Sequence, residues 1–192
     1  MAMEKKKKRV SKTKREPRTI VRKADRPVVG VVMGSQSDWP VVKETVAVLK
    51  QFKLPFEVRI ISAHRTPDEA SAFASTAARR GLKIIISAAG MAAHLGGVLA
   101  ANTHLPVIGV PMKGGAMDGM DALLATVQMP RGIPVATVAM GKSGAVNAAI
   151  LAVQILSLFD DNLKKKLQQY KLSLKQKVFE ADRALQKELK DI

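Results

Sequence analysis

The chain has 192 residues, a formal net charge of +16 and no cysteine. Its length fits one domain with appendages and is sufficient to bury a substantial core. The absence of cysteine excludes disulfides, thiolate catalysis and thiolate metal sites, and the 3 histidines are too few for a His-rich metal site. No apolar run predicts a membrane span, because residues 144–159 are better explained as a buried helix.

The positive charge is concentrated at the N-terminus. Residues 1–27 contain 12 Lys/Arg and 3 Asp/Glu, a net charge of about +9, and the rest of the chain carries about +7. Such a composition predicts a solvated, disordered tail. It has no apolar segment of a secretory signal, and its acids and Lys bias argue against a mitochondrial presequence. The run 5–9 (KKKKR) could bind polyanions or direct nuclear import, but such matches are common by chance.

After the tail, strand-like and helix-like segments alternate with short connections. The expected strands are 28–32, 56–61, 83–87, 107–110 and 134–140. The expected helices are 40–52, 67–80, 92–102, 118–126 and 145–159. Most of the strands are apolar without alternation, which is typical of a parallel sheet covered by helices on both faces. Repeated βα units of this length predict a doubly wound α/β domain, in which ligands bind beyond the carboxyl ends of the strands.

The helix expected at 67–80 has the clearest boundary signals. We expect Thr66 to cap it, Pro67 to take its first position and Glu69 to close a capping box. Gly81 should terminate it.

The segment 160–192 differs from the alternating strands and helices before it. Its apolar residues recur at spacings of three and four and form one stripe on a highly charged helix: Leu163, Leu167, Tyr170, Leu174, Val178, Ala181, Leu185 and Leu189. The simple interpretation is a helix packed on its own domain, but at this length we expect it to project and to cover a neighbouring subunit. We therefore divide the chain into a basic tail (1–27), an α/β domain (28–160) and a C-terminal amphipathic helix that makes an oligomer contact (161–192).

The turn after the first strand carries Ser35, Ser37 and Asp38 just before a helix. Free N–H groups and hydroxyls at the positive end of a helix dipole suit a phosphate, although Ser and Asp are also ordinary helix caps. The turn after the second strand repeats the pattern with Ser62 and Arg65, which favours phosphate binding because Arg offers a planar fork of donors. A carboxylate such as Asp38 can accept hydrogen bonds from ribose hydroxyls.

Two histidines lie near these turns. His64 precedes Arg65, and imidazole is a side chain commonly used in acid–base catalysis, although a lone loop histidine is more often structural. His94 follows the loop 87–93, which consists mostly of small residues. That loop suits either close helix–sheet packing or a tight, dry cleft around a flat ligand. His104 is expected at the other end of the sheet and to be structural. The turns and His64 together suggest an enzyme that acts on a small phosphorylated metabolite.

Five motifs occur in register: 33–38 (MGSQSD), 62–67 (SAHRTP), 92–95 (AAHL), 127–134 (VQMPRGIP) and 141–149 (GKSGAVNAA). Over about residues 28–167 they resemble the PurE family of N5-carboxyaminoimidazole ribonucleotide mutases. The resemblance implies a three-layer, flavodoxin-like domain with a five-stranded parallel sheet. It implies transfer of a carboxylate from the exocyclic nitrogen of the ribonucleotide to C4 of its imidazole ring, in purine synthesis. It also implies no metal or organic cofactor, and an octamer with sites at subunit junctions; we expect a cytoplasmic enzyme.

The resemblance assigns roles to particular positions of this chain. Its substrate-binding positions are Ser35, Ser37, Asp38, Ser62, Arg65 and Gly90. The serines and the arginine would hold the phosphate, and the aspartate would hold the ribose. The catalytic residues would be His64, for proton transfer, and His94, which would also help to shape the pocket. The small residues around Gly90 would keep water out and hold the released carbon dioxide close to C4.

The chain departs from the family pattern at three places. Met91 stands where the family usually has a second Gly, Gly96 where it has Pro, and 112–115 (MKGG) where it has a Ser-containing stretch. These changes bear on the geometry of the pocket more than on the class of reaction.

Two alternative functions remain open. The related carboxylase type adds free carbon dioxide to aminoimidazole ribonucleotide, but its small-residue loop and its counterpart of 128–130 typically differ from those here. A non-catalytic nucleotide-binding module, tethered to nucleic acid by the tail, is the other alternative. The tail has no aromatic residue for base stacking, so its nucleic-acid binding should be weak and steeply salt-dependent. The occurrence of His64 and Arg65 in one turn favours an enzyme.

Overall fold

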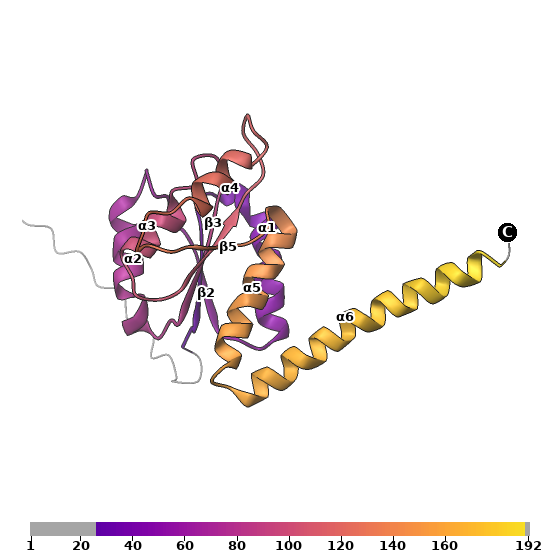
Figure 1. The fold of residues 1–192 in the computed structure, drawn as a ribbon. Coiled ribbons are helices and arrows are strands. Elements are labelled where there is room, and N and C mark those ends of the chain that lie inside the picture. The colour runs from indigo at the N-terminus through magenta and orange to yellow at the C-terminus, as the bar shows by residue number, and fades with distance from the viewer. Residues whose placement is uncertain (1–25, 191–192) are drawn as a thin grey trace, which may run out of the picture.

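A parallel five-stranded sheet forms the centre of the molecule in the computed structural model, which describes residues 26–190 (Figure 1). Its strands are β1 (Val29–Met33), β2 (Phe56–Ile60), β3 (Ile84–Ala89), β4 (Val107–Pro111) and β5 (Ala136–Thr137). Their order is β2-β1-β3-β4-β5. The chain therefore moves from β1 to one side and then returns to the other side of β1, which makes the β1–β3 junction the switch point of the sheet.

One short 3-10 helix and six α-helices surround or extend the sheet. They are η2 (Gln36–Asp38), α1 (Trp39–Gln51), α2 (Pro67–Arg80), α3 (Leu95–Ala101), α4 (Met120–Val127), α5 (Gly141–Ser157) and α6 (Asp161–Glu188). Helices α1 and α5 cover one face of the sheet, and α2 and α3 cover the other (Figure 1). The doubly wound, flavodoxin-like α/β fold expected from the sequence is confirmed.

Strand β1 shows how the two cores are divided. Val29 and Val31 belong to the core under α1 and α5, whereas Val32 belongs to the core under α2 and α3. Gly30 also faces the second core, where a Cβ would lie 2.9 Å from Cδ1 of Leu82 and 3.1 Å from Cζ of Phe73. The glycine thus makes room for the Phe73 ring to pack directly against the strand backbone.

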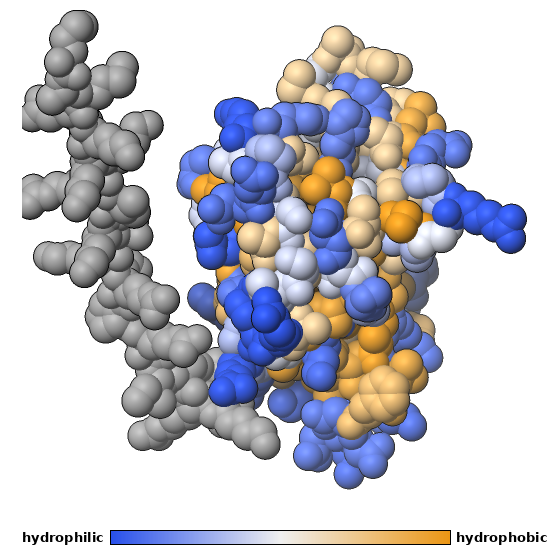
Figure 2. Space-filling view, turned by 90° about the vertical axis from the view of Figure 1, so that its left-hand side faces the viewer, coloured by the Kyte–Doolittle hydropathy of each residue, from blue (hydrophilic) through white to orange (hydrophobic). Residues whose placement is uncertain are grey.

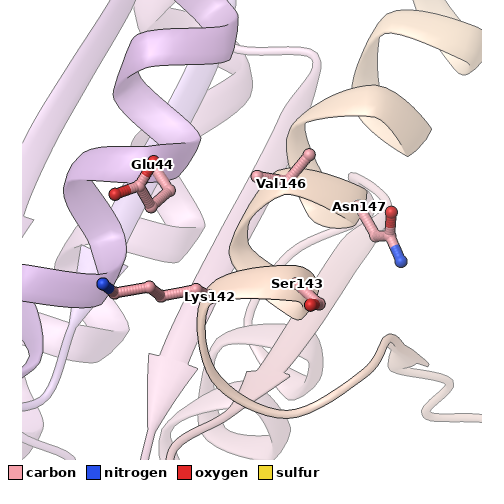
Figure 3. Close-up of a pocket in the computed structure, with 5 residues that line it drawn as sticks. All are labelled: Glu44, Lys142, Ser143, Val146 and Asn147. Atoms are coloured by element: carbon pink, nitrogen blue, oxygen red, sulfur yellow. The ribbon is translucent and has the colours of Figure 1, made fainter. Parts of the chain in front are cut away.

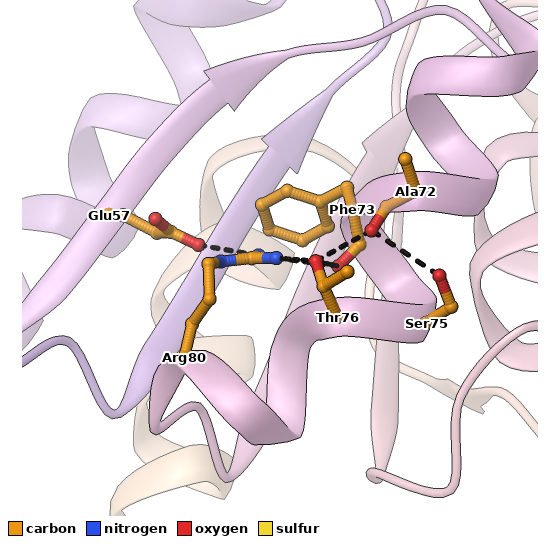
Figure 4. A network of polar contacts seen from close by, with 6 residues as sticks. All are labelled: Glu57, Ala72, Phe73, Ser75, Thr76 and Arg80. Carbon is orange, nitrogen blue, oxygen red and sulfur yellow. Dashed lines mark hydrogen bonds and ion pairs between the residues drawn. The ribbon is translucent and has the colours of Figure 1, made fainter. Parts of the chain in front are cut away.

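Arg80, at the end of α2, ties that helix to the edge strand β2 (Figure 4). Its guanidinium lies 4.5 Å from the centre of the Phe73 ring, and its Nη2 donates to Glu57 Oε1 at 2.9 Å. Its Nη1 donates to the Phe73 carbonyl oxygen and contacts the hydroxyl of Thr76. The Arg80 side chain therefore holds the C-terminal end of α2 against β2. The turn after β2 leads into the start of the same helix. Gly81 follows with φ 108 and ends the helix as expected.

The surface over α2 and α3 faces the viewer in Figure 2. Hydrophilic and apolar residues are interspersed there. None of the helices in residues 26–190 combines the length and the apolar character needed to cross a membrane.

Most predicted element boundaries agree with the structure to within two residues, but three elements differ by three or more. β5 is limited to Ala136–Thr137 because it is an edge strand that pairs only with β4. α3 begins at Leu95 and not at 92, because Met91 and Ala93 have φ values of 56° and 46°, outside the helical region. α5 begins earlier than expected, at Gly141.

The capping box predicted at Thr66 is also wrong. Thr66 makes no side-chain cap bond to α2; its Oγ1 accepts from the Ser62 N–H at 3.0 Å and donates to the Ser62 carbonyl oxygen at 3.1 Å. The hydroxyl closes the turn after β2 instead. A capping box is instead present in the turn after β1, where Ser35 caps the 3-10 helix η2 and Asp38 is the third residue of that helix.

Helix α6 leaves the domain after its first turns and extends away from it (Figure 1). Asp160 caps it, with Oδ1 accepting from the N–H groups of Asn162 and Leu163 at 2.9 and 3.0 Å. Leu163 and Leu167 are buried, and every residue from 171 to 190 is exposed. The helix therefore projects as expected. Its contact with a second subunit stays a prediction, and the expectations for the basic tail at 1–25 lie outside the described residues.

Candidate functional site

The turns after β1, β2 and β3 meet at the carboxyl edge of the sheet, because parallel strands all end there. Hydrogen bonds join the first turn to both of its neighbours. The Gly34 N–H donates to the Ala88 carbonyl oxygen of β3 at 3.1 Å. Nη2 of Arg65, from the turn after β2, donates to the Gly34 carbonyl oxygen at 3.4 Å. The predicted site residues on these three turns thus share one edge.

The first turn is preorganised by its own side chains. Asp38 Oδ2 accepts from the Ser35 N–H at 3.0 Å, and Ser35 Oγ accepts from the Ser37 hydroxyl at 2.9 Å and the Ser37 N–H at 3.3 Å. Burial raises the pKa of Asp38 above its ordinary value of 3.8, while hydrogen bonds from the Ser35 and Gly34 backbone lower it. The capping interpretation is correct for Ser35 and Asp38. It leaves the exposed Ser37 hydroxyl at the surface of the turn, where a ligand can reach it.

The second turn holds Arg65 against Ser62. Ser62 Oγ accepts from the Arg65 backbone N–H at 3.2 Å and from its Nε at 3.4 Å. Both side-chain contacts of this exposed guanidinium, to Ser62 and to Gly34, are long at 3.4 Å. A phosphate oxygen could replace them with shorter, charge-assisted bonds. The geometry therefore fits an anion at this turn.

His64 and His94 contact each other directly, which the sequence did not predict. His64 Nε2 lies 2.7 Å from His94 Nδ1, and the rings meet edge to face with centroids 4.8 Å apart. In this contact one ring offers an N–H and the other a lone pair, so a single proton occupies the space between the two nitrogens. Each exposed imidazole keeps its other nitrogen for a ligand. The pair can therefore hold and pass one proton beside the turns after β1 and β2.

The small-residue loop after β3 approaches its neighbours closely. A Cβ on Gly90 would lie 3.3 Å from Cβ of Met112, so a larger residue there would crowd the chain just after β4. Met91 and Ala93 both adopt positive φ, which is strained for residues other than Gly. The Met91 side chain is 65% exposed. The loop is thus shaped by strain as well as by small side chains.

Ser87 is a residue to which the sequence reasoning assigned no role. Its Oγ is buried within β3 and lacks a hydrogen-bond partner among the described residues. It lies 3.8 Å from where a Cβ of Gly96 would stand. No sequence signal distinguishes it from an ordinary strand serine.

A hollow of about 380 Å³ lies elsewhere, between α1 and the start of α5 (Figure 3). It is lined by Glu44, Lys142, Ser143, Val146 and Asn147. None of the predicted site residues lines it, so it is separate from the site at the strand ends. Within residues 26–190, no group of three or more His, Cys, Asp or Glu side chains is placed to hold a metal ion.

The strand order and the turns at the switch point place this chain in the class of doubly wound α/β proteins, in which ligands bind beyond the carboxyl ends of the strands. Comparison with known proteins gives the family. The chain belongs to the AIR carboxylase family, whose sequence profile matches residues 28–177.

Individual relatives cover most of this chain. The N5-carboxyaminoimidazole ribonucleotide mutase of Bacillus subtilis is 53% identical over 155 residues, which are 81% of this chain and 96% of that protein. The phosphoribosylaminoimidazole carboxylase of Saccharomyces cerevisiae is 54% identical over 153 residues, but the match spans only 26% of its length. The crystal structure of Treponema denticola PurE superposes with a TM-score of 0.74 at 31% identity and covers 83% of this chain and 99% of that one.

Proposed function

We propose that this chain is an N5-carboxyaminoimidazole ribonucleotide mutase of purine synthesis. The bacterial relative with this name matches over nearly its whole length. The observation in the structure that carries the proposal is the contact of 2.7 Å between His64 and His94 beside Arg65. It provides a proton carrier next to a turn that fits a phosphate.

In this proposal the substrate is held at the two turns. The hydroxyls of Ser35, Ser37 and Ser62 and the guanidinium of Arg65 bind the phosphate. Asp38 accepts hydrogen bonds from the ribose hydroxyls. The turns are already held in place by hydrogen bonds, so little reorganisation opposes binding.

The reaction needs one proton to change place. The bond between the exocyclic nitrogen and the carboxylate breaks, the nitrogen gains a proton, and carbon dioxide is released. A bond then forms between that carbon and C4, and C4 loses its proton. A single imidazole can deliver the first proton and accept the second, and we assign this step to His64. His94 orients the His64 ring, and the close loop at Gly90 keeps water from the released carbon dioxide.

A turnover assay with the purified full chain tests the function. We expect formation of 4-carboxy-5-aminoimidazole ribonucleotide from the carbamate substrate without added bicarbonate. The carboxylase alternative predicts equal or faster turnover of aminoimidazole ribonucleotide with dissolved carbon dioxide. Nucleotide binding without turnover of either substrate would favour a non-catalytic module.

We further propose a homo-octamer in the cytoplasm. The segment 88–158 is dense in Ala and Gly, which allow close contact between helices, and α6 carries an apolar stripe beyond its own domain. Light scattering at low micromolar concentration tests the assembly, and cell fractionation tests the location. Truncation after Asp161 should lower the melting temperature or the order of the oligomer. A monomer mass over a wide concentration range would contradict the assembly.

A further inference from the structure

Ser87 lies on β3 next to the start of α3, and its hydroxyl is a buried polar group without a partner. The residue is 2% exposed, and its Oγ makes no hydrogen bond among residues 26–190. A Cβ on Gly96 of α3 would lie 3.8 Å from this oxygen. A hydroxyl gives up its bonds to bulk water when it is buried, and leaving it unpaired costs stability. The group therefore indicates that a further polar partner belongs beside it.

The first turn of α3 supplies a donor close to this hydroxyl. No side chain caps α3, and its first backbone bond runs from the Val98 N–H to the His94 carbonyl oxygen at 3.0 Å. The N–H of the buried Gly96 precedes that bond and has no acceptor within the part of the chain that the structure describes. The family usually has Pro at this position, and Pro has no N–H. The donor is therefore a feature in which this chain departs from the family pattern.

The room beside Gly96 suits one small polar molecule. A Cβ on Gly96 would meet Val135 Cγ1 at 3.5 Å and Val135 Cγ2 at 3.9 Å, which are ordinary contacts like the one to Ser87. On Gly97 a Cβ would instead lie 3.1 Å from Cε of Met129, so only the first glycine leaves the space of a methyl group. A water site needs about 10–15 Å³ of room and at least two polar partners. Two neutral polar groups in an apolar setting favour a water over an ion.

We propose that one buried water joins Ser87 Oγ to the Gly96 N–H, and that Ser87 is thereby a positioning residue for His94. The N–H donates to the water oxygen, and the water and the hydroxyl share a second hydrogen bond. This bridge ties the first turn of α3 to β3, which is itself held between β1 and β4.

The bridge acts on His94 because this residue immediately precedes α3 and accepts the first backbone bond of the helix. The place of the first turn therefore sets the place of the His94 ring. The contact of 2.7 Å between His94 and His64 tolerates little displacement. The role in positioning rests on the proposed function, whereas the water site does not.

A high-resolution crystal structure of the full chain tests the site directly. We expect density for one water within about 3.2 Å of both Ser87 Oγ and the Gly96 nitrogen. The same water should be lost in Ser87→Ala. A Ser87 hydroxyl that bonds directly to a backbone group, with no water beside it, would overturn the proposal.

Gly96→Ala tests the site in solution, because it fills the space and keeps the N–H. With Ser87 in place, the new methyl group displaces the water and leaves the hydroxyl unpaired, so the urea midpoint should fall. In the Ser87→Ala background the same methyl group fills an apolar space and favours the helix, so the midpoint should rise. Gly97→Ala is the matched control, and its effect should be the same in both backgrounds. Equal effects of Gly96→Ala in both backgrounds would contradict the water site.

Turnover separates positioning from stability. At a temperature at which every variant is folded, Ser87→Ala should lower kcat several-fold and leave KM close to the wild-type value, because Ser62 and Arg65 lie on another turn. The double variant Ser87→Ala/Gly96→Ala should recover most of kcat, since the methyl group then holds the first turn of α3. An unchanged kcat in Ser87→Ala would remove the positioning role. If the wild type itself showed no mutase turnover, the proposed function would fail, and the crystal structure and urea midpoints would still decide on the water.

Discussion

The α/β domain and helix α6 differ in how far their apolar faces are buried. In the domain, helices α1, α2, α3 and α5 are covered within the same chain, and α5 alone has eight buried residues along its 17 positions. In α6 only two of 28 residues are buried. The hydrophobic stripe is as regular in α6 as in the domain helices, so the difference is in what lies opposite. A periodic apolar face predicts that a helix will be covered, but it does not say by which molecule.

From this comparison we propose that chemistry and intrinsic stability belong to the domain, and that α6 serves contact with other molecules. Four substitutions in the domain, each with a matched change in α6, test this division. The largest expected effect is on catalysis.

His64→Asn should lower turnover by at least about 10³-fold, because it removes the proton carrier. Nucleotide binding should stay within about tenfold of the wild type, since phosphate and ribose contacts provide most of the ground-state affinity. Steady-state assays and calorimetric titration measure the two quantities. The matched change in α6 is truncation after Lys177, which should leave turnover largely intact. Equal activity of His64→Asn and the wild type would remove His64 from the mechanism.

Leu49→Ala should destabilise the domain by about 2–5 kcal/mol, because the Leu49 side chain, on α1, is fully buried and its truncation leaves a cavity. Leu185→Ala, at a position that is 51% exposed in the single chain, should change the free energy of domain unfolding by less than about 0.5 kcal/mol. Urea denaturation followed by the fluorescence of Trp39, the single Trp of the chain, reports on the domain. Similar losses in both variants would show that α6 is part of the domain's cooperative unit.

Arg65→Ala should weaken substrate binding by about 1.5–3 kcal/mol, the value of one charge-assisted contact. Its long contacts to Ser62 and Gly34 indicate that little of the fold depends on it. Arg183→Ala removes the same type of side chain from α6 and should leave the Michaelis constant unchanged. If Arg65→Ala also left the Michaelis constant unchanged, the phosphate would bind elsewhere.

The smallest effect concerns Asp38. Because burial raises the pKa of its carboxyl in the folded state, the folded protein holds the proton more tightly than the unfolded chain does. Asp38 therefore makes the domain less stable as the pH rises from about 3.8 through its folded pKa. Asp38→Asn should flatten this part of the pH profile of stability, measured as urea midpoints at several pH values. Asp182→Asn, on exposed α6, should not alter the profile; a profile unchanged by Asp38→Asn would contradict the assignment.

The order of strands and helices along the chain was predictable from the sequence because it depends on local signals. Apolar runs gave the buried strands, and Gly81 marked the end of α2. The length of β5 was not predictable, because pairing at a sheet edge depends on neighbours and not on the apolar character of 134–140. The start of α3 was missed because the positive φ values of Met91 and Ala93 occur in residues that normally avoid them.

The sequence predicted where the candidate site residues lie in the fold, but not the contacts between them. Strand ends placed the residues at one edge of the sheet, and the motifs assigned them to substrate. The contact between His64 and His94 depends on β1 lying between β2 and β3, and on two side-chain orientations that no sequence pattern specifies. Likewise, Thr66 has the sequence signature of a helix cap, yet its hydroxyl bonds to Ser62. Hydroxyl residues at a turn can satisfy several nearby backbone groups, and sequence alone does not choose among them.

The central position of β1 has a consequence for folding kinetics. This strand is made first, but it pairs with β2, about 27 residues later, and with β3, about 55 residues later. Pairings over such separations close long loops and slow the formation of the native sheet. The bond from Gly34 to Ala88 forms only once β3 is in place, so the turn after β1 reaches its final conformation late. During synthesis on the ribosome, the apolar β1 therefore stays unpaired until its partner strands emerge, and an unpaired apolar strand favours aggregation.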